Sequence, residues 1–452
     1  MLEVKNKIKA FLGQDERSKN VNKNSVVIFI CKGMTMLISF FLLPLTIGYV
    51  DSETYGIWVT VSSMAAWLSV FDIGMGNGLK NKFVEYRAVG DNEMVRKYVS
   101  TTYAMLCVIF VPLLIVFLLI NPFINWNSLL NIDTTEDLHL VFAIVVSYFS
   151  LNFILSTITT VLIADQRPGE SSIQIVIQQL LLLITIILLT RLTEGSLMNL
   201  CLALCVVPLL VILAFNIVLF RGRYKEIRPS LSWVEFPLIK NLLNLSLKFF
   251  YLQIVGLILF QLTNFIIIRY YSAEDVTLYN VAYKYFTLPN GFFVAISTPI
   301  WAAIAEALAK KDNVWIKTSL KRYTYILFAF FAGEAIMLLI AQPVYHIWMG
   351  KTISTIPFMI SLFCMLSACI SMSTNVYVSA LCGAGILKLQ MLFCIVSPFT
   401  FIALCLLFIK VLHLGVWCIL FANLIANIYG LLIAPLQCYK VFYQNKGGWW
   451  NA

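Results

Sequence analysis

Long apolar stretches separated by short polar segments make up the chain from about residue 25 to residue 437. A run of about 20 apolar residues is long enough to cross the hydrocarbon core of a membrane as an α-helix. The pattern therefore predicts an all-α polytopic membrane protein with about twelve transmembrane helices. The predicted spans are 25–50, 56–79, 99–121, 138–163, 172–190, 197–220, 244–270, 277–306, 323–346, 356–381, 390–410 and 415–437.

Composition agrees with this pattern. Hydrophobic residues make up 60% of the 452 residues and charged residues only 12%. Soluble domains carry about 25% charged residues, so a large soluble enzyme is excluded, as are disordered and coiled-coil chains.

The basic residues predict the orientation in the membrane. Of the 32 Lys and Arg residues, 25 lie in segments on the N-terminal side of the predicted membrane and three lie inside spans. The opposite side holds only four: Arg191, Arg269, Lys351 and Lys410. Cytoplasmic loops are enriched in Lys and Arg, so both termini are expected in the cytoplasm. These basic cytoplasmic loops account for the net charge of +10, so we expect no nucleic-acid partner.

One long central connection divides the spans into six and six. Each half places an acidic outer hairpin ending in Tyr after its first span, at residues 49–55 and 271–279. Such halves are typical of transporters that bind substrate between two repeats. The expected organisation is a basic cytoplasmic segment 1–24, a six-helix bundle 25–220, a cytoplasmic linker 221–243, a second six-helix bundle 244–437 and a cytoplasmic tail 438–452.

The sequence offers no metal or catalytic constellation. The eleven cysteines lie almost entirely in apolar stretches without a CxxC pattern, which indicates small packing residues. His139, His346 and His413 are far apart. We therefore expect no metal site, no catalytic residue and no covalent step.

Three lysines fall inside predicted spans, where a charge costs a few kcal/mol. Lys32 lies about eight residues into the first span, roughly 12 Å deep. Thr35 and Ser39 fall within about 60° of it on an ideal helix, which predicts a polar face toward a cavity. Lys284 lies in the outer half of the eighth span beside a stripe of small residues. The alternative for each is a side chain that snorkels to the headgroups.

Lys248 is only about four residues into the seventh span, so a cavity and snorkelling are evenly balanced for it. On an ideal helix it points away from Gln253, Gln261 and Asn264. These three amides are candidates to line a sugar-binding surface, because sugars need neutral donors and acceptors. Hydrogen bonds between helices are the alternative role.

Two carboxyl groups inside spans are candidates for ion coupling. Asp72 lies near the cytoplasmic end of the second span, and Glu334 near the middle of the ninth. Glu334 could carry a coupling proton or pair with a lysine.

Three sequence runs resemble a known family: Asp-Ser-Glu-Thr-Tyr-Gly-Ile-Trp at 51–58, Phe-Asp-Ile-Gly-Met-Gly-Asn-Gly-Leu-Lys-Asn-Lys at 71–82 and Tyr-Val-Ser-Thr-Thr-Tyr at 98–103. They resemble the Wzx-type polysaccharide flippases of O-antigen and capsule pathways, in the multidrug/oligosaccharidyl-lipid/polysaccharide exporter superfamily. The glycine-rich run is neither a P-loop nor a dinucleotide fingerprint. It predicts either a flexible inner gate or a simple helix exit.

The resemblance implies two six-helix bundles forming a V around a central cavity. It implies transport of an undecaprenyl-diphosphate-linked oligosaccharide from the inner to the outer leaflet by alternating access. The candidate residues for the diphosphate are Lys32, Lys284 and Lys248. The resemblance also implies ion coupling, with H⁺ or Na⁺ as the candidate ion, and a location in the plasma membrane of a bacterial cell. Polysaccharide polymerase and chain-length proteins are candidate partners. A monomer is the default expectation.

Two other functions compete. A multidrug exporter of the same superfamily would need a net acidic cavity for organic cations, whereas the predicted spans contain three lysines and also three acids, Asp72, Glu306 and Glu334. An O-antigen polymerase or ligase would be expected to display a large outer loop with basic or catalytic residues. The longest outer loop, about 122–137, contains no Lys or Arg.

Overall fold

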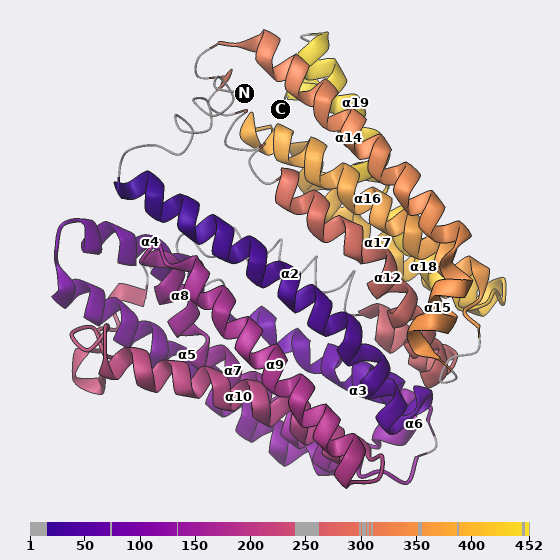
Figure 1. Ribbon diagram of the computed structural model, residues 1–452, viewed down its shortest axis with the longest axis horizontal. Helices are drawn as coiled ribbons and strands as arrows, with labels where there is room; N and C mark the ends of the chain where they lie inside the picture. Colours follow the sequence, from indigo (N-terminus) through magenta and orange to yellow (C-terminus); the bar gives the residue numbers. More distant parts are fainter. Residues whose placement is uncertain are drawn as a thin grey trace. The chain divides into compact units, whose positions relative to one another are not determined.

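The computed structural model describes residues 16–72, 75–132, 134–239, 262–297, 300, 304, 307–308, 311–350, 355–386, 388–444 and 448–451. Within these ranges the regular structure is helical throughout and no strand occurs, as predicted (Figure 1).

Eight described helical stretches are long and apolar enough to cross a membrane, and a pair bent by 47° would make nine. The eight are α2 (Glu16–Val50), α5 (Asn92–Ile120), α7 (Leu138–Leu155) with α8 (Thr157–Ala164), α9 (Pro168–Leu192), α10 (Leu197–Arg221), α14 (Asn313–Leu339), α16 (Phe358–Gly383) and α17 (Lys388–Leu406). The bent pair joins α18 (Trp417–Ala426) to Tyr429–Tyr443. The multi-pass architecture is confirmed, and the count of twelve stays a prediction.

Several shorter elements connect or extend these helices. They are α6 (Trp126–Leu130), α15 (Ala341–Met349), α19 (Ala434–Cys438), the 3-10 turns Asn121–Phe123, Leu231–Trp233 and Gly448–Asn451, and the π-helical turns Leu407–Val411, Tyr429–Ile433 and Tyr439–Tyr443. α2 begins at Glu16, so the last part of the predicted basic segment 1–24 is helical, and its cytoplasmic location stays a prediction.

The predicted second span, 56–79, is not one helix. It consists of α3 (Ser52–Ala65), a 3-10 stretch (Ala66–Asp72) and the start of α4 (Met75–Ala88). Gly76 lies inside α4, where an added Cβ would be 3.4 Å from the Thr160 hydroxyl oxygen of α8. This is an ordinary van der Waals distance, so the position does not require glycine, and the inner gate and the simple helix exit stay predictions.

Side-chain caps begin four of the long helices. In each case a side-chain oxygen of the residue before the helix accepts a backbone N–H from the first turn, which satisfies one of the unpaired donors there. The caps are Asp91 of α5, Asp137 of α7, Ser196 of α10 and Asp312 of α14.

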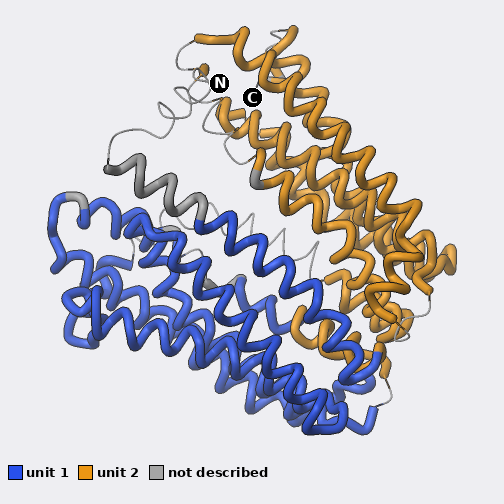
Figure 2. The backbone as a smooth tube through the Cα atoms, viewed as in Figure 1, with its two compact units in different colours: residues 1–51, 64–129, 133–254 blue, residues 52–63, 130–132, 255–452 orange. Residues whose placement is uncertain are grey.

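The chain divides into two compact units, drawn in different colours in Figure 2. Unit 1 contains residues 1–51, 64–129 and 133–254. Unit 2 contains residues 52–63, 130–132 and 255–452. In unit 1, α2 runs alongside α9, and α10 packs on both α7 and α9 (Figure 1).

A buried cluster at one end of unit 1 extends beyond the membrane helices. Phe83 of α4, Tyr98 of α5 and Phe220 of α10 pack there together with Tyr224 and Ile227, which follow α10. The first part of the predicted linker, 221–239, is thus fastened to unit 1 through apolar contacts.

Unit 2 is built on α12 (Ala273–Ser297), which packs against α16, while α16 also contacts α14 and α18. The first part of α3 belongs to this unit. The hydroxyl of Thr277 donates to the Ser52 carbonyl oxygen (2.5 Å), and Gly56 lies against the Ala273 carbonyl. A Cβ on Gly56 would lie 1.8 Å from that oxygen, so only glycine fits here.

Candidate functional site

Lys32 is an exposed residue on α2 of unit 1. On a helix of 3.6 residues per turn it shares a face with Thr35 and Ser39, as predicted from the spacing. The Thr35 hydroxyl donates to the Lys32 carbonyl oxygen (2.9 Å). Leu37 and Phe41 are exposed at 62% and 60%, and helical spacing places them on the opposite side of the helix. One side of α2 is therefore suited to a polar environment and the other to lipid.

The ammonium of Lys32 has no carboxylate within 4 Å among the described residues. The same holds for Lys284, an exposed residue of α12 in unit 2. Thr287, one turn further along α12, donates its hydroxyl to backbone carbonyl oxygens of the same helix, at 2.7 Å from that of Tyr283. Both lysine heads are thus available to an anionic ligand.

Asn264 is 7% exposed and is held between helices. Its amide nitrogen donates to the Ser63 hydroxyl of α3 (2.8 Å), and its amide oxygen accepts from Asn280 of α12 (2.9 Å). Asn280 also donates to the Val276 carbonyl oxygen (2.7 Å). In this conformation the amide of Asn264 serves helix–helix packing, which is the alternative role that its sequence position left open.

The side chains of four predicted site residues are not described by the structure. Lys248, Gln253 and Gln261 lie outside the described residues. Asp72 ends the 3-10 stretch after α3, and its side chain also lies outside the described part.

Glu334 is fully buried in α14, at 0% exposure. Neither carboxyl oxygen has a hydrogen-bond partner in the described part of the chain, and no lysine or arginine there lies within 4 Å. Glu334 lies five residues before the end of α14, and its depth in the membrane stays a prediction. One turn along, the Tyr285 hydroxyl of α12 donates to the Met337 carbonyl oxygen (3.2 Å). A buried carboxyl without partners is costly to ionise, so it is a site where a proton or cation would bind favourably.

Unit 2 also contains a polar pocket between α12, α16 and α18, with a cavity volume of about 350 Å³. We call it the amide pocket. Most of its lining residues carry hydroxyl or amide groups, and none carries a charge. The lining residues are Tyr283, Thr287, Asn290, Ser367, Ala368, Ile370, Ser371, Thr374, Asn375, Val378, Ser379, Asn423, Leu424 and Asn427.

One amide in this pocket is only half satisfied. The Asn290 amide nitrogen donates to the Ser371 hydroxyl (2.9 Å). Its oxygen is buried and has no partner among the described residues. An unpaired buried acceptor in an apolar bundle costs free energy comparable to a lost hydrogen bond, and a bound donor would recover it.

The sequence contained a signal for this pocket. Ser367, Ser371 and Thr374 recur at helical spacing in α16, followed directly by Asn375. This spacing places them on one face of the helix. The predicted sugar-binding amides, Gln253, Gln261 and Asn264, lie in other segments, so this stripe of neutral polar groups was not among the predictions.

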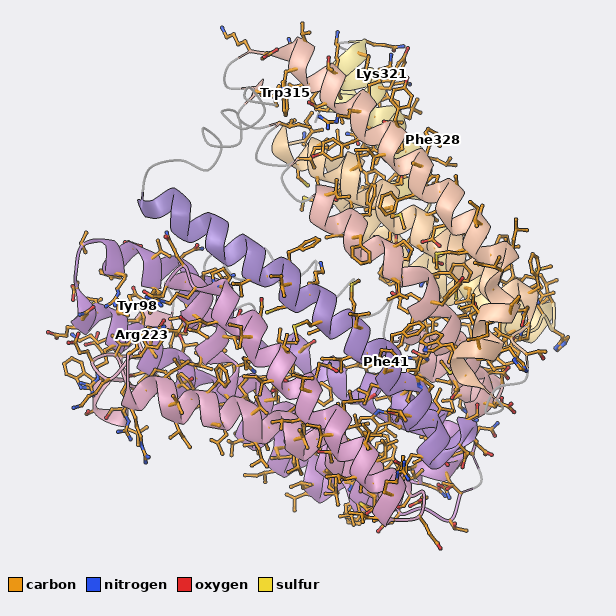
Figure 3. The ribbon with its side chains drawn as sticks, in the orientation of Figure 1. Phe41, Tyr98, Arg223, Trp315, Lys321 and Phe328 are labelled. Atoms are coloured by element: carbon orange, nitrogen blue, oxygen red, sulfur yellow. The ribbon has the colours of Figure 1, made fainter. Side chains whose placement is uncertain are left out.

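An ion-pair network fastens the loops of unit 1 at the end where Tyr98 and Arg223 lie (Figure 3). Asp165 accepts from the Tyr224 hydroxyl (2.9 Å), and the Arg223 guanidinium lies 2.7 Å from a Glu170 carboxylate oxygen. Burial, together with the neighbouring Asp165 carboxylate, raises the pKa of Tyr224. The hydrogen bond to Glu170 raises the pKa of Arg223. These pairs stabilise unit 1 and leave the ammonium of Lys32 outside the network.

Comparisons with known proteins agree with this architecture. A family profile described as polysaccharide biosynthesis protein matches residues 21–305. A putative O-antigen export protein of Yersinia pseudotuberculosis is 22% identical over 289 residues, which cover 61% of this chain and 63% of that protein. A putative O-antigen transporter of Salmonella typhi is 23% identical over 265 residues, which cover 57% and 59%. The match thus spans about three fifths of each relative.

Solved structures share the fold. An inward-facing multidrug resistance MATE family transporter has a TM-score of 0.70 at 14% identity, covering 94% of this chain and all of that one. The lipid II flippase MurJ in an inward closed conformation has a TM-score of 0.68 at 14% identity, covering 91% of this chain and 86% of that one. At this identity the similarity establishes the fold alone.

Proposed function

Because the chain belongs to the polysaccharide biosynthesis protein family, we propose that it is a flippase for lipid-linked oligosaccharides. The substrate is an undecaprenyl-diphosphate-linked repeat unit, moved from the cytoplasmic to the outer leaflet of the plasma membrane for O-antigen or capsule synthesis. The names of the O-antigen export relatives and the shared fold with a lipid II flippase support this proposal.

The observation that carries the proposal is the presence of unpaired cations on polar helix faces within an apolar protein. A diphosphate with sugars cannot cross hydrocarbon unaided, because its charges and hydroxyls would lose their water. A lysine ammonium is a compact point charge that suits phosphate. Lys32 of unit 1 and Lys284 of unit 2 are both exposed, and neither has a carboxylate partner in the described part of the chain.

In the predicted topology Lys32 lies toward the cytoplasmic side and Lys284 toward the outer side. The diphosphate binds Lys32 and Lys248, both expected toward the cytoplasmic side, and passes to Lys284 as the cavity changes its opening. The lipid tail stays in the bilayer throughout. Binding, orientation and desolvation suffice, and no covalent step is required.

Ion coupling is assigned to Glu334, with Asp72 as the second candidate. The buried Glu334 carboxyl would bind H⁺ or Na⁺ in one conformation and release it in another. Both termini are placed in the cytoplasm on the basis of the Lys and Arg distribution. The chain would act as a monomer that delivers repeat units to polysaccharide polymerase and chain-length proteins.

Complementation of a flippase-deficient strain that makes the native repeat unit tests this mechanism. Wild type, Lys32→Ala, Lys284→Ala and the control Lys225→Ala would be compared at equal membrane levels. Lys225 is an exposed lysine after α10, outside every predicted site. We expect wild type and control to restore surface polysaccharide, and both site variants to leave the precursor on the inner leaflet.

Normal export by both site variants would refute the lysine mechanism while leaving the flippase function intact. Failure of wild type would refute the function itself. Export of organic cations by wild type, with no effect on the precursor, would favour the multidrug alternative.

A further inference from the structure

Several side chains of the amide pocket of unit 2 present hydrogen-bond acceptors. The Thr287 and Thr374 hydroxyls each donate to a carbonyl oxygen of their own helix, at 2.7 and 2.8 Å. Each oxygen keeps lone-pair capacity for an incoming donor. The Asn290 oxygen has no partner among the described residues. A ligand that donates several hydrogen bonds is therefore the complement of this pocket.

Asn375 adds a further acceptor. Its amide nitrogen donates to the Ser371 carbonyl oxygen one turn earlier (3.0 Å), which orients the side chain and leaves its oxygen as an acceptor. Ser371 in turn accepts from Asn290 (2.9 Å), so amide and hydroxyl groups of α12 and α16 meet at the pocket. These contacts hold the acceptors in place before any ligand arrives, which limits the entropy lost on binding.

The electrostatics of the pocket exclude a phosphate. None of the lining residues is a lysine or arginine, and oxygen acceptors repel an anion. None is a carboxylate, so an organic cation would lack the opposite charge that normally compensates its desolvation. The lining instead matches a neutral, hydroxyl-rich molecule, because each sugar hydroxyl is both donor and acceptor.

The size of the pocket suits a ligand rather than a single trapped water. A volume of about 350 Å³ corresponds to roughly ten waters at ~30 Å³ each. It falls at the small end of the range of ligand pockets, about 300–1,000 Å³. Tyr283 adds an aromatic ring to the wall, and its ring centroid lies 5.6 Å from that of Tyr279. Such a ring can pack against the apolar C–H face of a sugar.

We propose that the amide pocket binds one neutral sugar residue of the carried oligosaccharide. This inference rests on the proposed flippase function and deepens it. The lysines bind the diphosphate that all substrates of this class share, whereas the amide pocket distinguishes one glycan from another. Unit 2 is therefore the part of the molecule that sets glycan specificity.

Binding to the full-length protein in lipid nanodiscs tests the proposal with two probes. One probe is undecaprenyl diphosphate without sugar, and the other is undecaprenyl diphosphate carrying the native repeat unit. The variants are Thr287→Val and Asn290→Leu, which keep side-chain volume while removing polar groups. The control is Thr318→Val, because Thr318 makes the same hydroxyl bond to a backbone carbonyl (2.9 Å) in α14 away from the pocket.

We expect each pocket variant to bind the glycan-bearing probe about tenfold more weakly than wild type, corresponding to the loss of one or two hydrogen bonds. The sugar-free probe should bind all proteins equally. Unchanged binding of both probes, or equal weakening of both, would overturn the pocket assignment while the flippase function stands. If wild type binds neither probe, the proposed function fails and the inference fails with it.

A thermal-shift measurement in NaCl and in KCl tests whether the amide pocket binds a sodium ion instead of a sugar. Stabilisation by sodium that is lost in Asn290→Leu would identify an ion site and overturn the sugar assignment. The sugar assignment predicts that the difference in unfolding temperature between the two salts is the same for wild type and Asn290→Leu.

Discussion

Replacement of Gly56 by alanine should destabilise unit 2, because no space exists for a side chain. The added Cβ would lie 1.8 Å from the Ala273 carbonyl oxygen and 2.6 Å from its carbon. Contacts of a Cβ below 3.0 Å essentially do not occur, so α3 and α12 would have to separate by at least 1.2 Å. Both contacting atoms of Ala273 belong to backbone, so rotation of a side chain cannot relieve the clash.

The cost follows from the neighbouring contacts. Overpacking that shifts backbone costs typically 1–3 kcal/mol, and the displacement would also stretch the hydrogen bond between Thr277 and the Ser52 carbonyl. We expect a loss of about 3 kcal/mol, or an unfolding midpoint lower by roughly 5–10 °C. The control is Gly48→Ala in α2, where an added Cβ meets nothing within 4 Å. That change should be neutral or stabilising by up to about 1 kcal/mol.

Thermal unfolding in detergent, followed with a thiol-reactive dye, would measure both variants. Most of the eleven cysteines are buried, so the dye reports unfolding. If Gly56→Ala unfolds at the same temperature as Gly48→Ala, the close approach of α3 to α12 is refuted.

Three further changes have defined outcomes. Glu334→Gln should fold normally, since it keeps the volume of a buried group that has no hydrogen-bond partner among the described residues. Transport should then lose its dependence on the proton or sodium gradient. Retained dependence in proteoliposomes would exclude Glu334 from coupling. Gly430→Ala should lower the unfolding temperature by several degrees, because its Cβ would lie 1.8 Å from the Thr374 hydroxyl oxygen. Adding Thr374→Ala should restore the unfolding temperature in the double variant. If it does not, the contact between Gly430 and Thr374 is contradicted. Asp165→Ala should lower the free energy of unfolding by about 1–3 kcal/mol, because the Tyr224 hydroxyl loses its acceptor. An unchanged unfolding midpoint would show that the ion-pair network does not contribute to stability.

The membrane architecture could be predicted from sequence because the physics of lipid is restrictive. Backbone groups in hydrocarbon must satisfy one another within a helix, so each long apolar stretch implies a helix. The predicted spans 172–190 and 197–220 correspond closely to α9 (Pro168–Leu192) and α10 (Leu197–Arg221). The broken second span was not predicted, because apolar content reports burial in lipid rather than local departures from α-helical geometry.

The candidate site was only partly accessible from sequence. Helical periodicity placed Lys32, Thr35 and Ser39 on one face, because that relation depends on spacing alone. The burial of Glu334 depends on side chains of α12 and α16 that pack around it. The amide pocket forms only where α12, α16 and α18 meet. Such tertiary contacts between residues distant in sequence cannot be read from periodicity.

A flipping assay in proteoliposomes tests the central claim most directly. The full-length protein would be reconstituted with undecaprenyl-diphosphate-linked native repeat units initially confined to the inner leaflet. The appearance of the glycan on the outside would be followed with a soluble lectin that binds the repeat unit. The proposed function predicts exposure far faster than in protein-free vesicles, and slower exposure with Lys32→Ala than with wild type. Exposure of the glycan at the protein-free rate would contradict the proposed flippase function.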